Sequence, residues 1–221
     1  MPMQTQTGFA EVNGTRLYYE IAGSGHPLVF IHGMSLDTRM WDDQFATFAQ
    51  HYTVLRYDLR GFGQSALPMG EPYARHDDLK TLLDSLEIAH AYILGLSMGG
   101  SIAVDFALAY PQATDALILV GSRLGGWQPD PEFAAFQNAV RVRAKEAGVQ
   151  AGRDVWLYSP LFNPALENPT VAPRLIQIIS EYSGWLWVHP NPLHELAPPA
   201  TQRLDTIRAN LVKTCLTWVR K

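Results

Sequence analysis

Ser97, in the Gly-x-Ser-x-Gly sequence at 95–99, is the residue of this chain best placed to do chemistry. It follows an apolar run at 91–94 that is typical of a buried strand, and a helical pattern begins directly after it. At such a tight strand-to-helix turn the serine hydroxyl stands clear of its neighbours, and the flanking glycines avoid a collision between helix and strand. The turn also aims the N–H of Met98 at any negative charge beside the serine. The sequence therefore predicts that Ser97 is a nucleophile.

The elements around this turn alternate between strands and helices. Strand patterns at 27–32, 52–58 and 116–121 are separated by helical patterns at 41–50 and 73–86, and an Asn-Gly pair at 13–14 predicts the turn of an N-terminal hairpin. This order indicates an α/β protein with a mostly parallel, doubly wound sheet and a β-hairpin at its start. The carboxyl ends of parallel strands share one edge of a sheet. We therefore expect the strand-end residues to converge there, namely His32, Asp58, Ser97 and Ser122.

Between residues 125 and 200 the strand patterns stop, while prolines, tryptophans and helical patterns at 133–147 and 174–182 appear. We expect a core at 1–124, a helical cap inserted at 125–200, and a return to the core at 201–221. Tryptophans such as Trp127 and Trp156 are explained most simply by packing of the cap against the core. A cap this aromatic still favours a pocket for an apolar or aromatic substrate over one for a highly charged substrate.

Composition limits the class of protein. The chain has 221 residues with 17 basic and 21 acidic side chains, a net charge of −4 and no basic patch, so nucleic-acid binding is not expected. The single Cys215 cannot form an intrachain disulfide, which favours a reducing compartment. No signal peptide or membrane-spanning run is recognisable. We expect a cytoplasmic protein without membrane contact, and the oligomeric state stays open, a homodimer included.

Three pieces of sequence occur in the order and approximate spacing of α/β-hydrolase-fold proteins that carry a helical cap. They are His-Gly-Met at 32–34, Asp-Leu-Arg-Gly-Phe-Gly-Gln-Ser at 58–65 and Gly-Leu-Ser-Met-Gly-Gly at 95–100. The chain resembles this family from residue 9 to about residue 210. Its sequences at 55–58 (Leu-Arg-Tyr-Asp) and 95–100 are similar to those of 3-oxoadipate enol-lactonases and related small carboxylesterases.

The resemblance implies a role for each matching residue. Ser97 would attack a small carboxylic ester or lactone and form an acyl-enzyme, without a metal or an organic cofactor. The N–H groups of Met34 and Met98 would form the oxyanion hole, whose donors stabilise the tetrahedral intermediate. His32 would orient its loop rather than act as the base, and Asp58 and Arg60 would have structural roles. The substrate pocket is expected beside His32, Gly33, Trp127 and Trp156.

The family's acid and histidine, which follow the nucleophile in that order, have no match in this sequence. Residues 202–210 resemble the helix before the seventh strand, but no Gly-x-x-Asp comes next, and the stretch at 211–219 is instead rich in β-formers that predict a stand-in strand. We therefore expect a C-terminally truncated hydrolase that lacks the last strands of the fold and whose activity is at or near background. His189 and His194 of the cap are the alternative bases, should either swing toward Ser97.

Two other functions are compatible with the same residues. A non-catalytic hydrolase-fold protein would bind a small apolar ligand beneath the cap and retain Ser97 as a remnant. A relative with different chemistry, such as a cofactor-free haloperoxidase or a C–C bond hydrolase, would use the same turn.

Overall fold

The computed structural model describes residues 4–207 and 210–214, and its centre is a seven-stranded sheet in the order β1-β2-β4-β3-β5-β6-β7. β1 (Thr5–Val12) and β2 (Thr15–Ala22) form an antiparallel hairpin, and β2 also pairs antiparallel with β4 (Thr53–Tyr57). The other pairs are parallel and involve β3 (Pro27–Ile31), β5 (Ala91–Leu96), β6 (Thr114–Val120) and β7 (Asn210–Thr214). The predicted α/β class and mostly parallel sheet are confirmed.

Local sequence explains both ends of the sheet. Asn13 and Gly14 adopt φ angles of 43° and 72°, the two positive values that a type I′ hairpin turn requires. At the other edge, β7 pairs with β6 and begins the strand predicted at 211–219. Residues 215–219 of that prediction lie outside the described residues.

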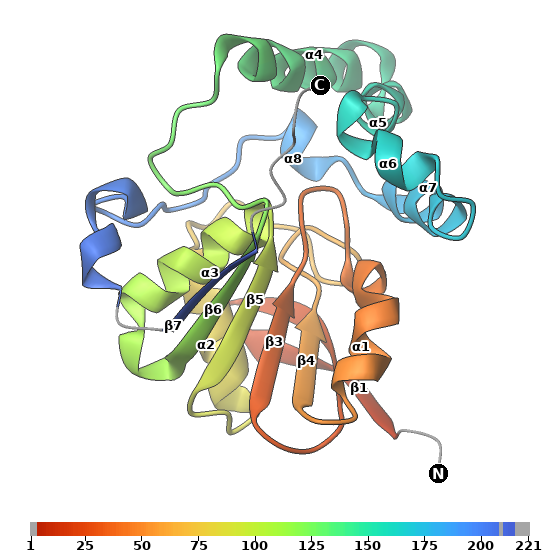
Figure 1. Ribbon diagram of the computed structural model, residues 1–221. Helices are drawn as coiled ribbons and strands as arrows, with labels where there is room; N and C mark the ends of the chain where they lie inside the picture. Colours follow the sequence, from red (N-terminus) through yellow and green to blue (C-terminus); the bar gives the residue numbers. More distant parts are fainter. Residues whose placement is uncertain (1–3, 208–209, 215–221) are drawn as a thin grey trace.

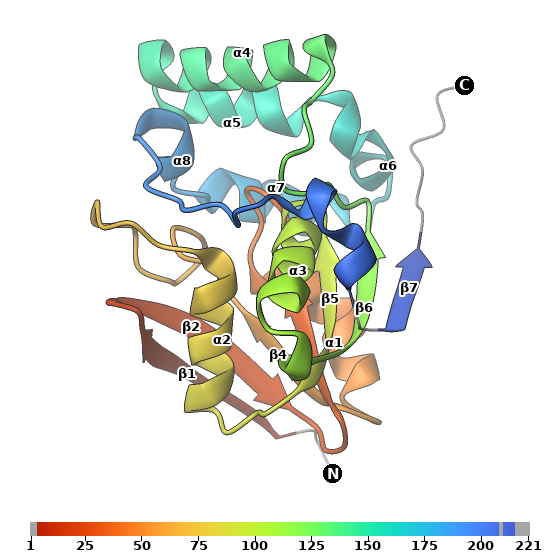
Figure 2. The same ribbon diagram turned by 90° about the vertical axis from the view of Figure 1, so that its left-hand side faces the viewer.

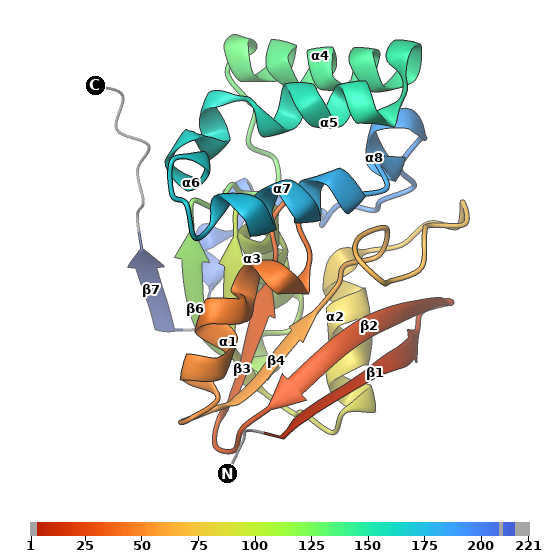
Figure 3. The same cartoon turned by 90° about the vertical axis from the view of Figure 1, so that its right-hand side faces the viewer.

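Helices cover both faces of the sheet. α2 (Arg75–Ser85) and α3 (Met98–Ala109) lie on one face (Figure 2), whereas η1 (Thr38–Trp41) and α1 (Asp42–Phe48) lie on the other (Figure 3). Alternate residues of β3 pack on the two faces of the sheet, because successive side chains of a strand point in opposite directions. Val29 and Ile31 belong to the core cluster under α2 and α3, while Leu28 and Phe30 pack with Trp41 and Phe45 on the α1 side.

A helical layer of α4 to α8 lies above the carboxyl ends of the parallel strands (Figure 1). It consists of α4 (Pro131–Ala147), α5 (Val149–Leu157), α6 (Asn163–Leu166), α7 (Ala172–Glu181) and α8 (Trp185–Val188). A short 3-10 turn, η3 (Pro160–Phe162), lies between α5 and α6, and two more, η4 (Ala200–Gln202) and η5 (Leu204–Thr206), follow α8. A fourth 3-10 turn, η2 (Pro111–Ala113), precedes β6. Asp130 caps the start of α4 by accepting from the N–H of Phe133. Gly148, at φ 88°, turns the chain into α5. No helix among the described residues is both long and apolar enough to cross a bilayer.

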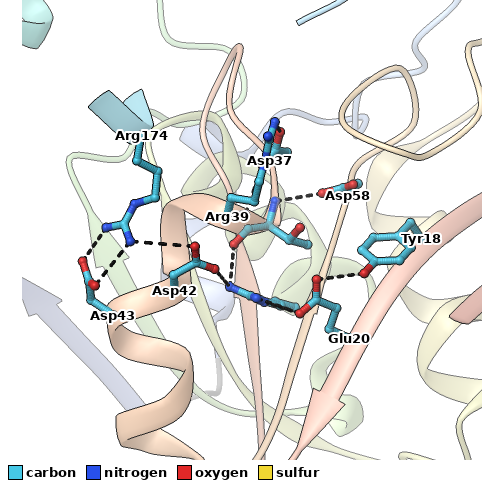
Figure 4. Close-up of polar contacts among 10 residues, drawn as sticks. Tyr18, Glu20, Asp37, Arg39, Asp42, Asp43, Asp58 and Arg174 are labelled. Atoms are coloured by element: carbon cyan, nitrogen blue, oxygen red, sulfur yellow. Dashed lines mark hydrogen bonds and ion pairs between the residues drawn. The ribbon is translucent and has the colours of Figure 1, made fainter. Parts of the chain in front are cut away.

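Charged side chains connect this layer to the α1 side of the sheet (Figure 4). Arg174 of α7 pairs with Asp43 and, at 3.7 Å, with Asp42 of α1. Arg39 donates to Glu181 of α7 at 2.6 Å and also pairs with Asp37. Because exposed ion pairs contribute little free energy, these contacts orient the layer more than they stabilise it.

We predict that Leu55→Ala lowers the free energy of unfolding by about 2–5 kcal/mol, since it removes buried methyl groups and leaves a cavity. Leu55 lies in β4 with 0 % of its surface exposed. Urea unfolding followed by circular dichroism measures the change. Leu67, which is 47 % exposed, provides the matched control: Leu67→Ala should change stability by no more than about 0.5 kcal/mol. Equal losses for both variants would contradict the packing described.

Candidate active site

The turn between β5 and α3 holds Ser97 in a strained backbone conformation. Its φ of 54° and ψ of −112° are sparsely populated for a residue with a side chain. The N–H of Ser97 donates to the carbonyl oxygen of Val120 at 2.8 Å, which ties the turn to β6. Gly95 and Gly99 have no room for a side chain, because a Cβ on Gly95 would collide with the carbonyl of Gly99. The two glycines therefore permit the sharp reversal that Ser97 occupies.

The loop after β3 packs directly against this turn. A Cβ on Gly99 would collide with the carbonyl oxygen of Ile31 and lie 2.6 Å from that of His32. A Cβ on Gly33 would lie 2.9 Å from Cδ2 of Leu96, the residue before Ser97. The chain segment that leads to Met34 and the turn that contains Met98 are thus in contact.

A cavity of about 190 Å³ adjoins this contact and brings three predicted residues together. Met34, Met98 and Trp156 all line it, and Trp156 reaches it from α5 of the helical layer. The indole N–H of Trp156 donates to the hydroxyl of Ser35, so the layer is bonded to the loop that carries Met34. Ser97 is half-buried and is not among the lining residues. The remaining lining residues are Arg75, Gln137, Val140, Arg141, Leu186, Trp187 and Asn191.

His32 is fully buried and uses both ring nitrogens to hold loops in place. Its Nε2 accepts from the N–H of Leu59 at 3.0 Å, so Nδ1 carries the proton and donates to the carbonyl oxygen of Gly33 at 2.8 Å. Burial lowers the pKa of His32 to about 4. With 0 % exposure it offers no surface to a substrate, and Gly33 is buried as well. The pocket expected from the sequence therefore does not include these two residues.

Trp127 lies in a second cavity, of about 350 Å³, rather than beside Trp156. It is 42 % exposed, and the guanidinium of Arg123 lies 4.8 Å from its ring centroid. The two cavities share Arg75, Met98 and Gln137 as lining residues, so they adjoin. Sequence reasoning missed Arg75 of α2 and Gln137 of α4, because no motif marks them and only the three-dimensional arrangement places them in one cavity lining with Met98.

Asp58 and Arg60 lie in the buried frame of the loops. The Asp58 carboxylate accepts from the backbone N–H groups of Thr38 and Gln64, each at 2.8 Å (Figure 4 shows Asp58). Burial raises the pKa of Asp58 to about 6, and these two hydrogen bonds oppose part of that rise. Arg60 forms a two-pronged ion pair with Asp78 at 2.8 and 3.0 Å. Asp58 therefore holds the backbone at Thr38 and Gln64, whereas Arg60 ties its loop to α2.

All seven histidines fall within the described residues, and none is hydrogen-bonded to Ser97. His189 stacks on Trp185 with the ring centroids 5.0 Å apart. His76 and His194 line the cavity of about 350 Å³ that also contains Met98. Among the described residues no side chain forms a hydrogen bond with the Ser97 hydroxyl.

Comparison with known proteins identifies the class to which this fold and turn belong. A family described as the alpha/beta hydrolase fold matches residues 26–210. The chain belongs to the α/β hydrolase fold family.

Among curated relatives, a putative carbamate hydrolase of Yersinia enterocolitica is 34 % identical over 113 residues, which cover 48 % of this chain and 41 % of the relative. A soluble epoxide hydrolase of a Corynebacterium species is 36 % identical over 100 residues, covering 44 % and 35 %. An uncharacterized protein of Mycobacterium tuberculosis is 39 % identical over 116 residues, covering 52 % and 34 %. In each of these cases the match spans less than half of the relative's length.

Solved structures with the same fold cover more of the chain. The enol-lactonase from Burkholderia xenovorans superposes with a TM-score of 0.69 at 25 % identity, covering 94 % of this chain and 91 % of that one. A thermophilic esterase from Thermogutta terrifontis gives a TM-score of 0.65 at 27 % identity, covering 81 % and 67 %. The chain is thus similar over most of its length to hydrolases of more than one specificity.

We predict that His32 makes stability depend on pH. Its pKa falls from 6.5 to about 4 on folding, so the folded chain binds fewer protons than the unfolded chain between these values. Its contribution is therefore present above pH 6.5 and is lost as the pH falls toward 4. We compare the free energy of unfolding of the parent chain with that of His32→Gln. The difference in favour of the parent chain should decrease by about 3 kcal/mol from pH 7 to pH 4.

Urea titrations at several pH values measure this difference. The contributions of titratable groups that both chains share, including Asp58, cancel in it. A difference that does not change with pH would contradict the buried, hydrogen-bonded state of His32.

Proposed function

We propose that Ser97 is the nucleophile of a serine hydrolase that acts on a small carboxylic ester or lactone. Its hydroxyl attacks the carbonyl carbon, the carbonyl oxygen becomes an oxyanion, and the alcohol leaves as an acyl-enzyme forms. Water then attacks the acyl-enzyme and releases the acid. The N–H groups of Met34 and Met98 are the proposed donors to the oxyanion, and two such donors lower the barrier by several kcal/mol in related chemistry.

The observation that carries this proposal is the strained backbone of Ser97, with φ 54°, at the start of α3. Strain of this kind persists where the surroundings over-determine it and is concentrated at functional sites. The shared cavity of Met34 and Met98 supplies a space for the acyl group beside the proposed donors. The likeness to an esterase and an enol-lactonase supports the same reaction class.

The composition of the cavity guides the proposed substrate. Val140, Leu186 and the two indoles of Trp156 and Trp187 form an apolar wall that suits an aliphatic or aromatic acyl group. Arg75 and Arg141 add two guanidinium groups to the same lining, and Nε of Arg75 is buried without a hydrogen-bond partner among the described residues. We propose a substrate with an apolar body and a polar or carboxylate end.

We further propose that turnover by this chain is at or near background. A serine hydroxyl without an imidazole partner is a weak nucleophile near neutral pH, and no histidine is hydrogen-bonded to Ser97 among the described residues. Removing the base from a Ser-His-Asp system costs several orders of magnitude, while the oxyanion donors and substrate binding leave a residual catalysis.

Chemical rescue tests this proposal. Imidazole added to the buffer supplies the missing base, so hydrolysis of p-nitrophenyl acetate by the parent chain should exceed that by Ser97→Ala by about tenfold or more, since only the parent chain has the hydroxyl that forms an acyl-enzyme. Subtracting the Ser97→Ala rate removes direct hydrolysis by imidazole. Intact mass spectrometry should detect the acetyl group on the parent chain only.

Identical rates for the two proteins at every imidazole concentration would overturn the nucleophile assignment. Fast turnover that depends on Ser97 without imidazole would instead overturn the proposed near-background activity, and would direct attention to His194, which lines the same cavity as Met98.

The Ser97 hydroxyl forms no hydrogen bond with a side chain among the described residues. This observation favours a second candidate, a ligand-binding protein without catalysis. On this alternative the cavity around Trp156 binds a small apolar acid or ester that is never cleaved. Quenching of tryptophan fluorescence by phenylacetate, lost in Trp156→Leu but retained in Ser97→Ala, together with no rescue by imidazole, would favour this alternative over the hydrolase.

A further inference from the structure

Three metal-ligating side chains meet at the end of the sheet opposite to Ser97. His26 directly precedes β3, His90 directly precedes β5, and Asp115 is the second residue of β6. Nε2 of His26 lies 2.9 Å from Oδ2 of Asp115, and Nδ1 of His90 lies 2.6 Å from the same oxygen. Their ligand atoms all lie within 4.8 Å of one another.

Strand pairing explains how residues so distant in sequence come together. β3 and β5 pair in parallel with Leu28 opposite Tyr92, and the same register continued two residues back sets His26 beside His90. β5 and β6 change register at this point: Ala91 pairs with Thr114, but Tyr92 pairs with Ala116. Asp115 is therefore the extra residue of a β-bulge, a feature that re-aims a side chain.

The polar atoms of the cluster are incompletely satisfied by one another. One carboxylate oxygen faces both imidazoles, and although His90 is hydrogen-bonded to it, Nε2 of His26 is buried without a hydrogen-bond partner among the described residues. The ring of His26 is held against Tyr92, with the centroids 4.1 Å apart. Nε2 of His26 thus lies 2.9 Å from the carboxylate without forming a hydrogen bond to it, and an imidazole nitrogen held in this way is a suitable ligand for a cation.

We propose that His26, His90 and Asp115 form a site for Zn²⁺. Two imidazole nitrogens and a carboxylate oxygen are donors that zinc accepts, at about 2.0–2.2 Å and in a tetrahedral arrangement. Such an arrangement sets ligand atoms roughly 3.3 Å apart, so the carboxylate and the imidazoles must separate by a few tenths of an ångström. Their side chains are 31 %, 35 % and 52 % exposed for His26, Asp115 and His90, which leaves room for this movement.

The proposed ion cross-links the amino ends of three adjacent strands, with water completing its coordination. Because these ligands lie at the opposite strand ends from Ser97, the ion takes no part in the proposed ester chemistry. Its expected effect is on stability, since a ligand that binds the folded chain alone raises the free energy of unfolding. The proposal does not depend on the proposed function.

Calorimetric titration with zinc sulfate tests the site in a tag-free Cys215→Ser chain, which removes the single thiol. We expect one zinc ion per chain, a rise in the melting temperature with added zinc, and an intense visible absorption typical of tetrahedral coordination when Co²⁺ replaces zinc. His90→Ala and Asp115→Asn should each weaken zinc binding by about tenfold or more, because even outer partners of zinc ligands contribute that much. His189→Ala, an exposed histidine in the helical layer, should leave binding unchanged.

Absence of zinc binding by the folded parent chain, checked by circular dichroism, would overturn the proposal. Binding that survives in both His90→Ala and Asp115→Asn, or that is lost only in His189→Ala, would overturn it as well. Ester hydrolysis is not part of this readout, so failure here and failure of the serine mechanism are distinguishable.

Discussion

The close approach of α3 to the end of β3 is the constraint on which the rest of the structure depends. It exists because Gly95 and Gly99 carry no side chain, so the helix can fold back until its first turn touches the carbonyls of Ile31 and His32. The cost is the backbone strain of Ser97, on the order of 1–3 kcal/mol for such conformations. Hydrogen bonding to Val120 and the surrounding parallel strands offset that cost.

This approach also explains how a helical layer and a sheet form one cavity. The loop after β3 is held from below by His32 and Asp58, whose hydrogen bonds reach Leu59, Thr38 and Gln64. From above, Trp156 donates to Ser35 in the same loop. Buried polar groups thus fix the position of Met34, while the ion pairs around Arg39 and Arg174 act at the exposed rim (Figure 4).

Short-range sequence signals anticipated the fold well. The Asn-Gly pair at 13–14, the apolar strands and the glycines around Ser97 each specify a backbone conformation within a few residues, and the structure has the corresponding turn, strands and strand-to-helix reversal. The alpha/beta hydrolase fold family that matches residues 26–210 agrees with that class. Local residue types determine such features, so one sequence suffices to predict them.

Contacts between distant elements could not be predicted in the same way. Nothing local distinguishes Trp156, which lines the cavity of Met34, from Trp127, which lies in its neighbour. A register change between β5 and β6 brings Asp115 to His26 and His90. No residue type in the sequence predicts this change. Such details follow from how elements dock, and only the three-dimensional structure reveals them.

A crystal structure of this chain with a small alkyl boronic acid would test the central claim most directly, because boron forms a tetrahedral adduct with a serine hydroxyl and imitates the proposed intermediate. We predict boron bonded to Oγ of Ser97, a positive φ at that residue, and one boronate oxygen about 3 Å from the backbone nitrogens of Met34 and Met98. Ser97 inside a continuous helix, or a bound boronate that points away from both nitrogens, would contradict the account.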